Sequence, residues 1–372
     1  MSELSSYSPK KEIKLVVSDL HFGSGKRNDE GAVNLNEDFQ EDEMFIDFLE
    51  YYSSEEFNEY CIELIFNGDN FEMIDPPWYK EVGEDPMLMD AKLSVSRLKA
   101  IWSGHPEIFD KLKVFNSFHN RSIRFLPGNH DQILIFSEVK EWIWQQIGGK
   151  VEFSDDFYLD NGIYIEHGQQ YTYITWFDPE KKIVRVEEKE ILNHDWTTIF
   201  SFEYVYSKKV KNFYAPYNIT PAIKAIKKGL FFETRFTFQY LLGMIWFLLK
   251  TAIFPVRKFL TNSRTTGKIF SELSSDFSPN LENEAKKLLA KKEIQIVIFG
   301  HSHRYYFWKD KKGKVYINTG SWTDQTNLTV QNLGKWRKFP FAYLEREDGV
   351  LKLVELREWK GIWKPDRKLF SL

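Results

Sequence analysis

Five short apolar runs in this sequence each end in a turn that carries aspartate, asparagine or histidine, and this pattern limits the fold more than any other feature. The turns are Ser18–His21, Asn67–Asn70, Pro127–Asp131, Glu166–Gly168 and Gly300–His303. Each preceding run has the length and composition of a buried β-strand. In open α/β sheets, ligands bind beyond the carboxyl ends of the strands. The five turns are therefore expected to meet at one end of the strands.

Regular secondary structure is expected around these turns. Strands are expected at residues 13–18, 61–66, 123–126, 151–159, 163–166, 294–299, 305–309, 315–318, 341–346 and 351–356. Helices are expected at residues 42–52, 87–118, 137–147 and 283–291, and the second of these is expected to be interrupted at Gly104 and Pro106. Asp160-Asn161-Gly162 is a strong hairpin signal. Strand–helix units first and hairpins later predict an α/β (α+β) fold, with two packed mixed β-sheets flanked by helices.

The composition favours one large domain with an insertion. The chain has 372 residues, of which 42% are hydrophobic, and that is enough for a large core. The single cysteine, Cys61, excludes an internal disulfide framework and a thiolate metal cage. The first residues show no basic stretch followed by an apolar one, so we expect no secretory signal and a cytoplasmic protein.

The turns supply oxygen and nitrogen ligands without sulfur. Imidazole and carboxylate together suit Mn, Fe, Zn, Ni or Co, and they argue against copper–thiolate and all-oxygen calcium sites. Seven such residues exceed what one ion takes from a protein, whereas two ions that share a carboxylate would use them all. Paired ions are suited to the hydrolysis of phosphate esters.

The same turns resemble the signature of the calcineurin-like metallophosphoesterases, which is DxH, GD, GNH(D/E), H and GHxH in that order. All five elements are intact and in order within residues 13–170 and 291–322. The resemblance implies the four-layer sandwich of that family and hydrolysis of a phosphoester or pyrophosphate by a metal-bound hydroxide. It implies two divalent ions, manganese first, with Fe, Zn, Ni or Co as alternatives. One ion would be held by Asp19, His21, Asp69 and His303, and the other by Asp69, Asn129, His167 and His301.

The resemblance also implies a role for His130, which is not a metal ligand in that family. His130 is expected to contact the phosphate and to act as a general acid on the leaving oxygen. Glu72 is expected to be its carboxylate partner, and the alternative is that Glu72 caps a helix near Pro76. The three histidines outside the motifs are expected at the surface or in loops. They are His105, His119 and His194.

Two further elements resemble the UDP-diacylglucosamine hydrolase-like branch of the family. Gly68–Glu72 fits its GD-x-F-E element, and Asn318–Trp322 fits its N-T-G-(D/S)-W element. The lipid A enzymes of that branch have arginine where this chain has His130. A phosphoester on a lipid-linked or nucleotide-sugar-lipid substrate is therefore expected. The alternatives are a DNA repair-type nuclease, which Pro76-Pro77 favours, and a metal-binding module without activity.

Residues 171–285 lack the catalytic pattern and are expected to form an inserted helical cap, with residues 1–170 and 286–372 as the catalytic core. Residues 221–268 hold nine basic residues and one acidic residue, so their net charge is +8 while the whole chain carries −4. Phe236–Leu249 carries no charge and is too short to span a bilayer.

Basic flanks around an apolar helix predict contact with lipid or with an anionic membrane surface, which would place the protein peripherally on the inner face of the membrane. The alternatives for this segment are packing on the core and a contact between two copies of the chain. Nucleic acid is disfavoured, because nucleic-acid channels are polar with scattered aromatic side chains.

Overall fold

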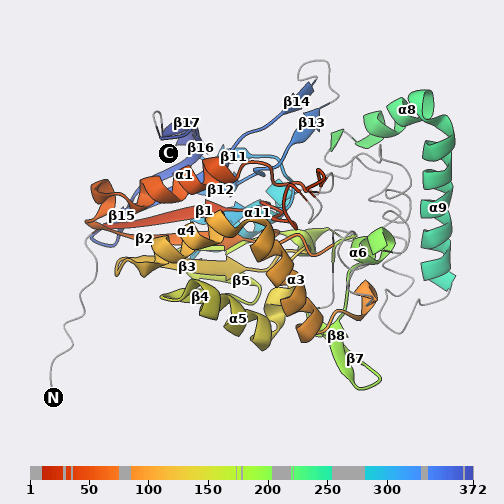
Figure 1. Ribbon diagram of the computed structural model, residues 1–372. Helices are drawn as coiled ribbons and strands as arrows, with labels where there is room; N and C mark the ends of the chain where they lie inside the picture. The colour runs from red at the N-terminus through yellow and green to blue at the C-terminus, as the bar shows by residue number, and fades with distance from the viewer. Residues whose placement is uncertain are drawn as a thin grey trace.

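A computed structural model describes residues 11–27, 31–34, 37–74, 85–172, 174–176, 179–202, 219–220, 222–253, 281–327, 334–362 and 365–371. Figure 1 shows two β-sheets with helices around them and a pair of helices, α8 and α9, set apart from the sheets. The larger sheet has seven strands and the smaller sheet has five. The predicted class, two mixed sheets flanked by helices, is confirmed.

The larger sheet has the order β17-β16-β15-β1-β2-β3-β4. Its parallel half pairs β1 with β2, β2 with β3 and β3 with β4, and its other strands are antiparallel. The strands are β1 (Lys11–Val17), β2 (Tyr60–Asn67), β3 (Arg121–Leu126), β4 (Val151–Phe153), β15 (Pro340–Glu347), β16 (Val350–Trp359) and β17 (Asp366–Ser371). Leu15, Val16 and Val17 of β1 are all fully buried, because both faces of this strand are covered.

The smaller sheet has the order β11-β12-β10-β6-β5, in which β10 lies parallel to both β6 and β12. Its strands are β5 (Phe157–Asp160), β6 (Ile163–Glu166), β10 (Ile296–Phe299), β11 (Tyr306–Lys309) and β12 (Val315–Asn318). Asn161 and Gly162 both have positive φ in the β5–β6 turn, as the sequence of that turn predicts.

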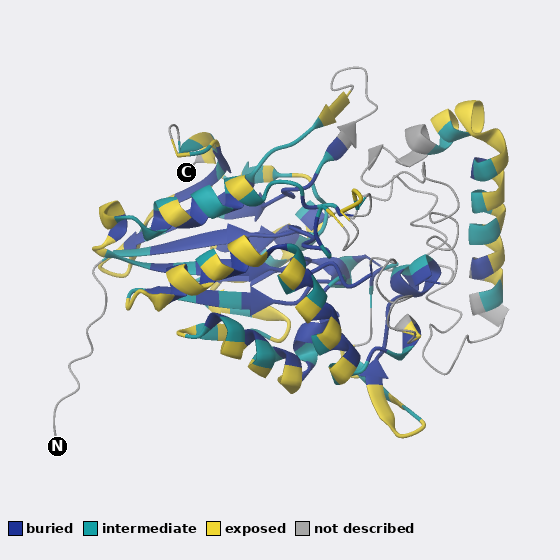
Figure 2. Ribbon diagram, viewed as in Figure 1, coloured by how far each residue is buried: buried dark blue, intermediate teal, exposed yellow. Residues whose placement is uncertain are grey.

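Three apolar clusters define four layers. One cluster joins Val16 and Ile65 of the larger sheet to Ile165 and Ile298 of the smaller sheet, so the two sheets pack face to face. A second cluster covers the other face of the larger sheet with helices α1 (Asp42–Ser53), α3 (Ala91–Gly104), α4 (Pro106–Ser117) and α5 (Ser137–Ile147). A third packs α11 (Leu281–Leu289) on the outside of the smaller sheet. Figure 2 shows the strands buried between these helices.

Local signals explain the ends of the helices. Asp90 caps α3, since its carboxylate accepts the N–H of Leu93 at 2.8 Å. The helical stretch over residues 87–118 is interrupted at Gly104 and Pro106, as expected, and forms α3 and α4, because Pro106 cannot continue a helix but suits the first turn of the next one.

The prediction of one strand over residues 151–159 was wrong. The structure divides this segment into β4 in the larger sheet and β5 in the smaller sheet. The chain crosses between the sheets at Ser154-Asp155-Asp156, whose polar side chains suit a turn. The hairpin β7 (Ile183–Val186) and β8 (Lys189–Leu192) and the last strand β17 were also not predicted.

Residues 171–285 contain α6 (Trp196–Phe200), α8 (Ala222–Phe232) and α9 (Thr234–Ile253), besides the β7–β8 hairpin. Phe247 of α9 packs against Trp196 and Phe200 of α6, with ring centroids 5.4 and 5.3 Å apart. The predicted boundary at residue 285 falls inside α11. The division into a core and an inserted cap stays a prediction.

Candidate metal centre

The carboxyl ends of five parallel strands bring the predicted ligands together. Asp19 and His21 follow β1, Asp69 follows β2, and Asn129 and His130 follow β3. His167 follows β6, and the pair His301 and His303 follows β10, so both sheets contribute. Among the described residues, three groups have three possible ligand atoms within 4.8 Å of one another; one of them is His21, Glu72 and His130, and the other two consist of predicted ligands. These two groups are Asp19, His21 and His303, and Asp69, His167 and His301.

The backbone at these turns is held in an unfavourable conformation. Five of the candidate ligands have positive φ, between 51° and 66°, although none of them is glycine. They are Asp19, His21, Asp69, His301 and His303. Such residues are uncommon and gather at functional sites, where the surrounding structure imposes the conformation.

Two glycines make room for the ligand side chains. A Cβ on Gly68 would collide with the ring of His167, and a Cβ on Gly128 would collide with the carboxylate of Asp69. The glycines of the GD and GNHD motifs are therefore required because ligand side chains of other turns occupy the space beside them.

The first group places facing nitrogens and a carboxylate around a small volume. His21 Nε2 lies 3.2 Å from His303 Nε2, and Asp19 Oδ1 lies 3.3 Å from His303 Nε2. His21 Nδ1 lies 2.9 Å from Glu72 Oε2, so Nδ1 carries the proton of that hydrogen bond and Nε2 faces the group. Burial lowers the pKa of His21, but Glu72 outweighs this effect and raises it.

The second group has the same design. His167 Nδ1 donates to the carbonyl oxygen of Asn67 at 2.7 Å, which directs Nε2 toward Asp69 Oδ2 at 3.0 Å. Burial raises the pKa of Asp69, but the His167 and His130 rings outweigh it and hold that pKa well below its usual range. Burial and the neighbouring His167 lower the pKa of His301 to about 3, so its ring is neutral and has a free lone pair.

The residues fit a pair of divalent ions. Asn129 is 7% exposed, and within the described parts of the chain its Oδ1 has no hydrogen-bond partner. A buried amide oxygen in that state is suited to a cation. Its neighbour His130 donates its backbone N–H to Asp69 Oδ1 at 2.7 Å, so Asn129 lies beside the second group. The donor set of oxygen and nitrogen suits Mn, Fe, Zn, Ni or Co.

The expected contact between His130 and Glu72 is present. His130 Nδ1 lies 2.8 Å from Glu72 Oε2, and the same oxygen is hydrogen-bonded to His21 Nδ1. Burial raises the pKa of Glu72, but His130 and His21 outweigh it and hold the pKa far below its usual range. Burial lowers the pKa of His130, but Glu72 and Asp69 together raise it to about 10. The ring is therefore protonated at neutral pH, as a general acid requires.

Asp131 has a structural role that the sequence analysis did not predict. Its carboxylate accepts the backbone N–H of Gly128 at 2.5 Å, of Asn70 at 2.8 Å and of Asp69 at 3.2 Å. Burial and the charge of Asp69 raise the pKa of Asp131 to about 6. Asp131 thus holds the turn after β3 against the turn after β2. Its place as the last residue of the GNHD motif was the signal for this role.

The Asn318–Trp322 element supports the end of β1. Ser321 Oγ donates to the carbonyl oxygen of Asp19 at 2.8 Å, and Ser18 Oγ bonds both the Asp19 carboxylate and Thr319 Oγ1. Trp322 is fully buried, and its Nε1 donates to the carbonyl oxygen of Pro340 at 2.8 Å. These contacts orient a candidate ligand.

All three remaining histidines lie outside helices and strands, in loops as expected, but two of them are buried rather than at the surface. His105 is 2% exposed and lies between Asp42, at 2.5 Å, and Glu37, at 3.5 Å. His194 is 8% exposed, and only His119 is at the surface. His105 is buried because two carboxylates from other segments surround it, and sequence spacing does not show such a contact.

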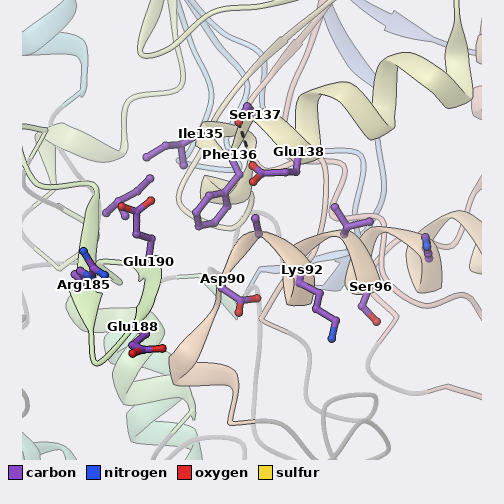
Figure 3. Close-up of a pocket in the computed structure, with 14 residues that line it drawn as sticks. Asp90, Lys92, Ser96, Ile135, Phe136, Ser137, Glu138, Arg185, Glu188 and Glu190 are labelled. Atoms are coloured by element: carbon purple, nitrogen blue, oxygen red, sulfur yellow. Dashed lines mark hydrogen bonds between the residues drawn. The ribbon is translucent and has the colours of Figure 1, made fainter.

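One large hollow lies away from the candidate metal ligands. A cavity of about 960 Å³ lies between α3, the start of α5 and the β7–β8 hairpin (Figure 3). Its wall mixes acidic side chains, such as Glu188 and Glu190, with basic ones, such as Lys92 and Arg185. This wall carries four acidic and three basic residues and includes none of the seven candidate ligands.

The chain is similar to several solved structures at low sequence identity. No family model matches the chain, and no curated protein matches it. A solved dimetal phosphatase from Danio rerio is 12% identical, over 97% of this chain and 99% of its own, with TM-score 0.38. The calcineurin-like phosphoesterase YfkN from Bacillus subtilis is 13% identical, over 92% and 87%, with TM-score 0.34. Vacuolar Protein Sorting 29 from Cryptosporidium parvum is 11% identical, over 97% and 98%, with TM-score 0.33.

Proposed function

We propose that this protein is a dinuclear metal-dependent phosphoesterase that hydrolyses a phosphoester or pyrophosphate bond. The observation that carries the proposal is the pair of adjacent ligand groups at the ends of five strands. The groups adjoin at Asp19, whose Oδ1 lies 3.3 Å from His303 Nε2 and 3.9 Å from His167 Nε2. Two ions at such positions suit the in-line displacement at a phosphate.

Seven residues would hold the ions, with Asp69 shared between them. One ion would take Asp19, His21, Asp69 and His303, and the other Asp69, Asn129, His167 and His301. When bound, two divalent ions supply a nucleophile from water near neutral pH and neutralise charge on the phosphate. Manganese is proposed first, with Fe, Zn, Ni or Co as alternatives, since the same donors accept each of them.

His130 would protonate the leaving oxygen. Glu72 accepts the proton of His130 Nδ1, which leaves the Nε2 proton for the leaving group. Because the same Glu72 oxygen also meets His21 Nδ1, one carboxylate orients a metal ligand and the general acid together. Glu72 thus orients the imidazole rings of His21 and His130 and favours the protonated form of His130.

A lipid-linked or nucleotide-sugar-lipid substrate is part of the proposal. Apolar side chains surround a hollow of about 10 Å³ beside His130, and all five are buried: Ile74, Met89, Ile133, Leu192 and Phe202. The Gly68–Glu72 and Asn318–Trp322 elements also resemble the UDP-diacylglucosamine hydrolase-like branch. A cytoplasmic location at the inner face of the membrane would suit such a substrate.

The test compares substrates and two matched variants. Protein stripped with a chelator and reloaded with each metal is assayed on bis(p-nitrophenyl) phosphate, a lipid-linked nucleoside diphosphate sugar and single-stranded DNA. Asp69→Asn is expected to lower metal content and to remove turnover. Asp160→Asn removes a carboxylate that pairs with Lys14 and Arg346 away from the ligand groups, and it is expected to keep both.

Three results would contradict the proposal or its parts. Near-normal turnover with two ions in Asp69→Asn would exclude the shared carboxylate. Metal binding without turnover of any substrate would favour a non-enzymatic module. Faster hydrolysis of DNA than of the lipid-linked substrate would favour a nuclease.

A further inference from the structure

The helices α8 and α9 expose an apolar surface, which we call the outer face. Phe231 is 80% exposed, Phe232 69% and Trp246 68%, and Phe231 and Phe232 contact each other at the end of α8. The outer face consists of Leu230, Phe231, Phe232, Phe238, Leu242, Ile245, Trp246 and Leu249. Water-facing surfaces rarely carry contiguous patches of this kind, and such patches mark sites of interaction.

The two sides of α9 differ. The exposed apolar positions on α9, from Phe238 to Leu249, recur three or four residues apart and so form one stripe. The opposite side carries Tyr240, Met244 and the buried Phe247, which pack on α6. Figure 2 shows the exposed side of α9 directed away from the two sheets. The uncharged run Phe236–Leu249 was expected to meet lipid as a whole, but one side of it belongs to a core.

The charge of this region selects the partner. Lys227 and Lys228 of α8 and Arg235 of α9 are exposed, and Glu233 is the one acidic residue in the sequence between 221 and 268. A second copy of the chain would bring the same positive charges face to face, and like charges across an interface are unfavourable. Anionic lipid headgroups complement these charges, and the apolar stripe suits the boundary between headgroups and acyl chains.

We propose that the outer face of α8 and α9 docks on an anionic membrane surface. The inference does not depend on the proposed hydrolysis, because it rests on the exposed side chains and their charge. None of the described helices, α9 included, is long and apolar enough to cross a bilayer.

Docking would bring the candidate metal centre close to lipid. Phe247 of α9 contacts α6, and Thr198 of α6 and Phe202, two residues beyond it, line the small hollow beside His130. One helix therefore separates the outer face from the general acid.

The experiment is vesicle flotation with the full chain, using phosphatidylcholine vesicles with and without phosphatidylglycerol. Flotation is expected only with the anionic vesicles. High salt should weaken it, because charge attraction is screened within about 10 Å at 0.1 M salt. Phe238→Gln/Leu242→Gln/Trp246→Gln should lower binding at least about 100-fold, because three large apolar side chains no longer enter the membrane.

A charge variant and a control variant complete the design. Lys227→Gln/Lys228→Gln/Arg235→Gln should lower binding about 100-fold, since each basic residue contributes about fivefold. Trp144→Gln removes a tryptophan that is 51% exposed on α5 and should leave binding unchanged. All three proteins should keep the melting temperature and the turnover of bis(p-nitrophenyl) phosphate of the parent, because the replaced side chains are exposed.

Two results would overturn the proposal. One is a parent protein that does not float with anionic vesicles, or an apolar variant that floats as well as the parent. The other is a parent that sediments as a dimer while the apolar variant sediments as a monomer, which would assign the outer face to a second copy.

Discussion

The buried His105 should make the stability of the fold depend on pH above neutrality. His105 Nδ1 lies 2.5 Å from Asp42 Oδ1, and its Nε2 lies 3.5 Å from Glu37 Oε2. Burial lowers the pKa of His105, but Asp42 and Glu37 outweigh it and raise the pKa from 6.5 to about 9. Lys26, which pairs with Asp42, is the other charged group in this cluster.

The direction of this pH dependence of stability follows from the raised pKa of His105. Because the folded pKa is above the unfolded one, the protonated ring stabilises the fold fully below pH 6.5. This stabilisation is lost as the pH rises through about 9. At 1.36 kcal/mol per pKa unit, the shift corresponds to about 3 kcal/mol.

His105→Gln keeps a neutral donor and removes the titration. We expect this variant to be less stable than the parent by about 3 kcal/mol at pH 6, and the difference should nearly vanish at pH 9.5. The free energy of unfolding is measured by urea titration with EDTA present, so that metal binding does not contribute. His119→Gln, at an exposed site, is the control and should show no such dependence. A deficit of equal size at both pH values would refute the reasoning.

The cluster of His105, Asp42 and Glu37 also contacts the loop that follows the first candidate metal ligands. Glu37 accepts the backbone N–H of Gly23 at 3.0 Å and of Gly25 at 2.7 Å, in the loop that follows His21. A protonated His105 attracts the Glu37 carboxylate across 3.5 Å and so helps to hold this side chain in position. We therefore expect the pH dependence to reach the loop after the first candidate metal ligands.

Four further variants test three separate features. His130→Ala should keep both metals and slow hydrolysis roughly 10²–10⁴-fold for leaving groups that need a proton, with a much smaller effect on p-nitrophenolate; equal slowing for all leaving groups would point to phosphate binding instead. Gly68→Ala should lower metal content measured by elemental analysis, because its Cβ would collide with His167 and its φ of +79° disfavours alanine; full metal content would contradict the crowding. Phe247→Ala should cost about 3–5 kcal/mol, while Trp246→Ala should cost within about 0.5 kcal/mol, both read from thermal unfolding; similar losses would mean that α9 has no inner and outer side.

The proximity of the candidate ligands was accessible from the sequence because parallel strands deliver their turns to one end. Asp19, Asp69 and His301 belong to three such turns, and the structure brings them together as that rule requires. The helix α5 and the β5–β6 turn were also accessible, because a helical period and an Asn-Gly pair act locally.

Contacts between distant segments were not accessible. Three features join residues far apart in the chain. Residues 151–159 are divided between two sheets, Glu72 is hydrogen-bonded to both His21 and His130, and His105 is buried against Glu37. A one-dimensional pattern contains spacing but no partner, so it cannot show which side chains meet across a core.

The segment Phe236–Leu249 shows most clearly what the sequence determined and what only the tertiary structure decided. Its apolar composition and basic flanks were determined by the sequence alone, and they predicted a lipid-facing helix. Only the tertiary structure decided that Phe247 faces α6 while Trp246 faces outward. The physical reason is that neighbouring residues of a helix point about 100° apart. Two equally apolar side chains can therefore lie one in a core and one in solvent when only one side of the helix packs on a neighbour.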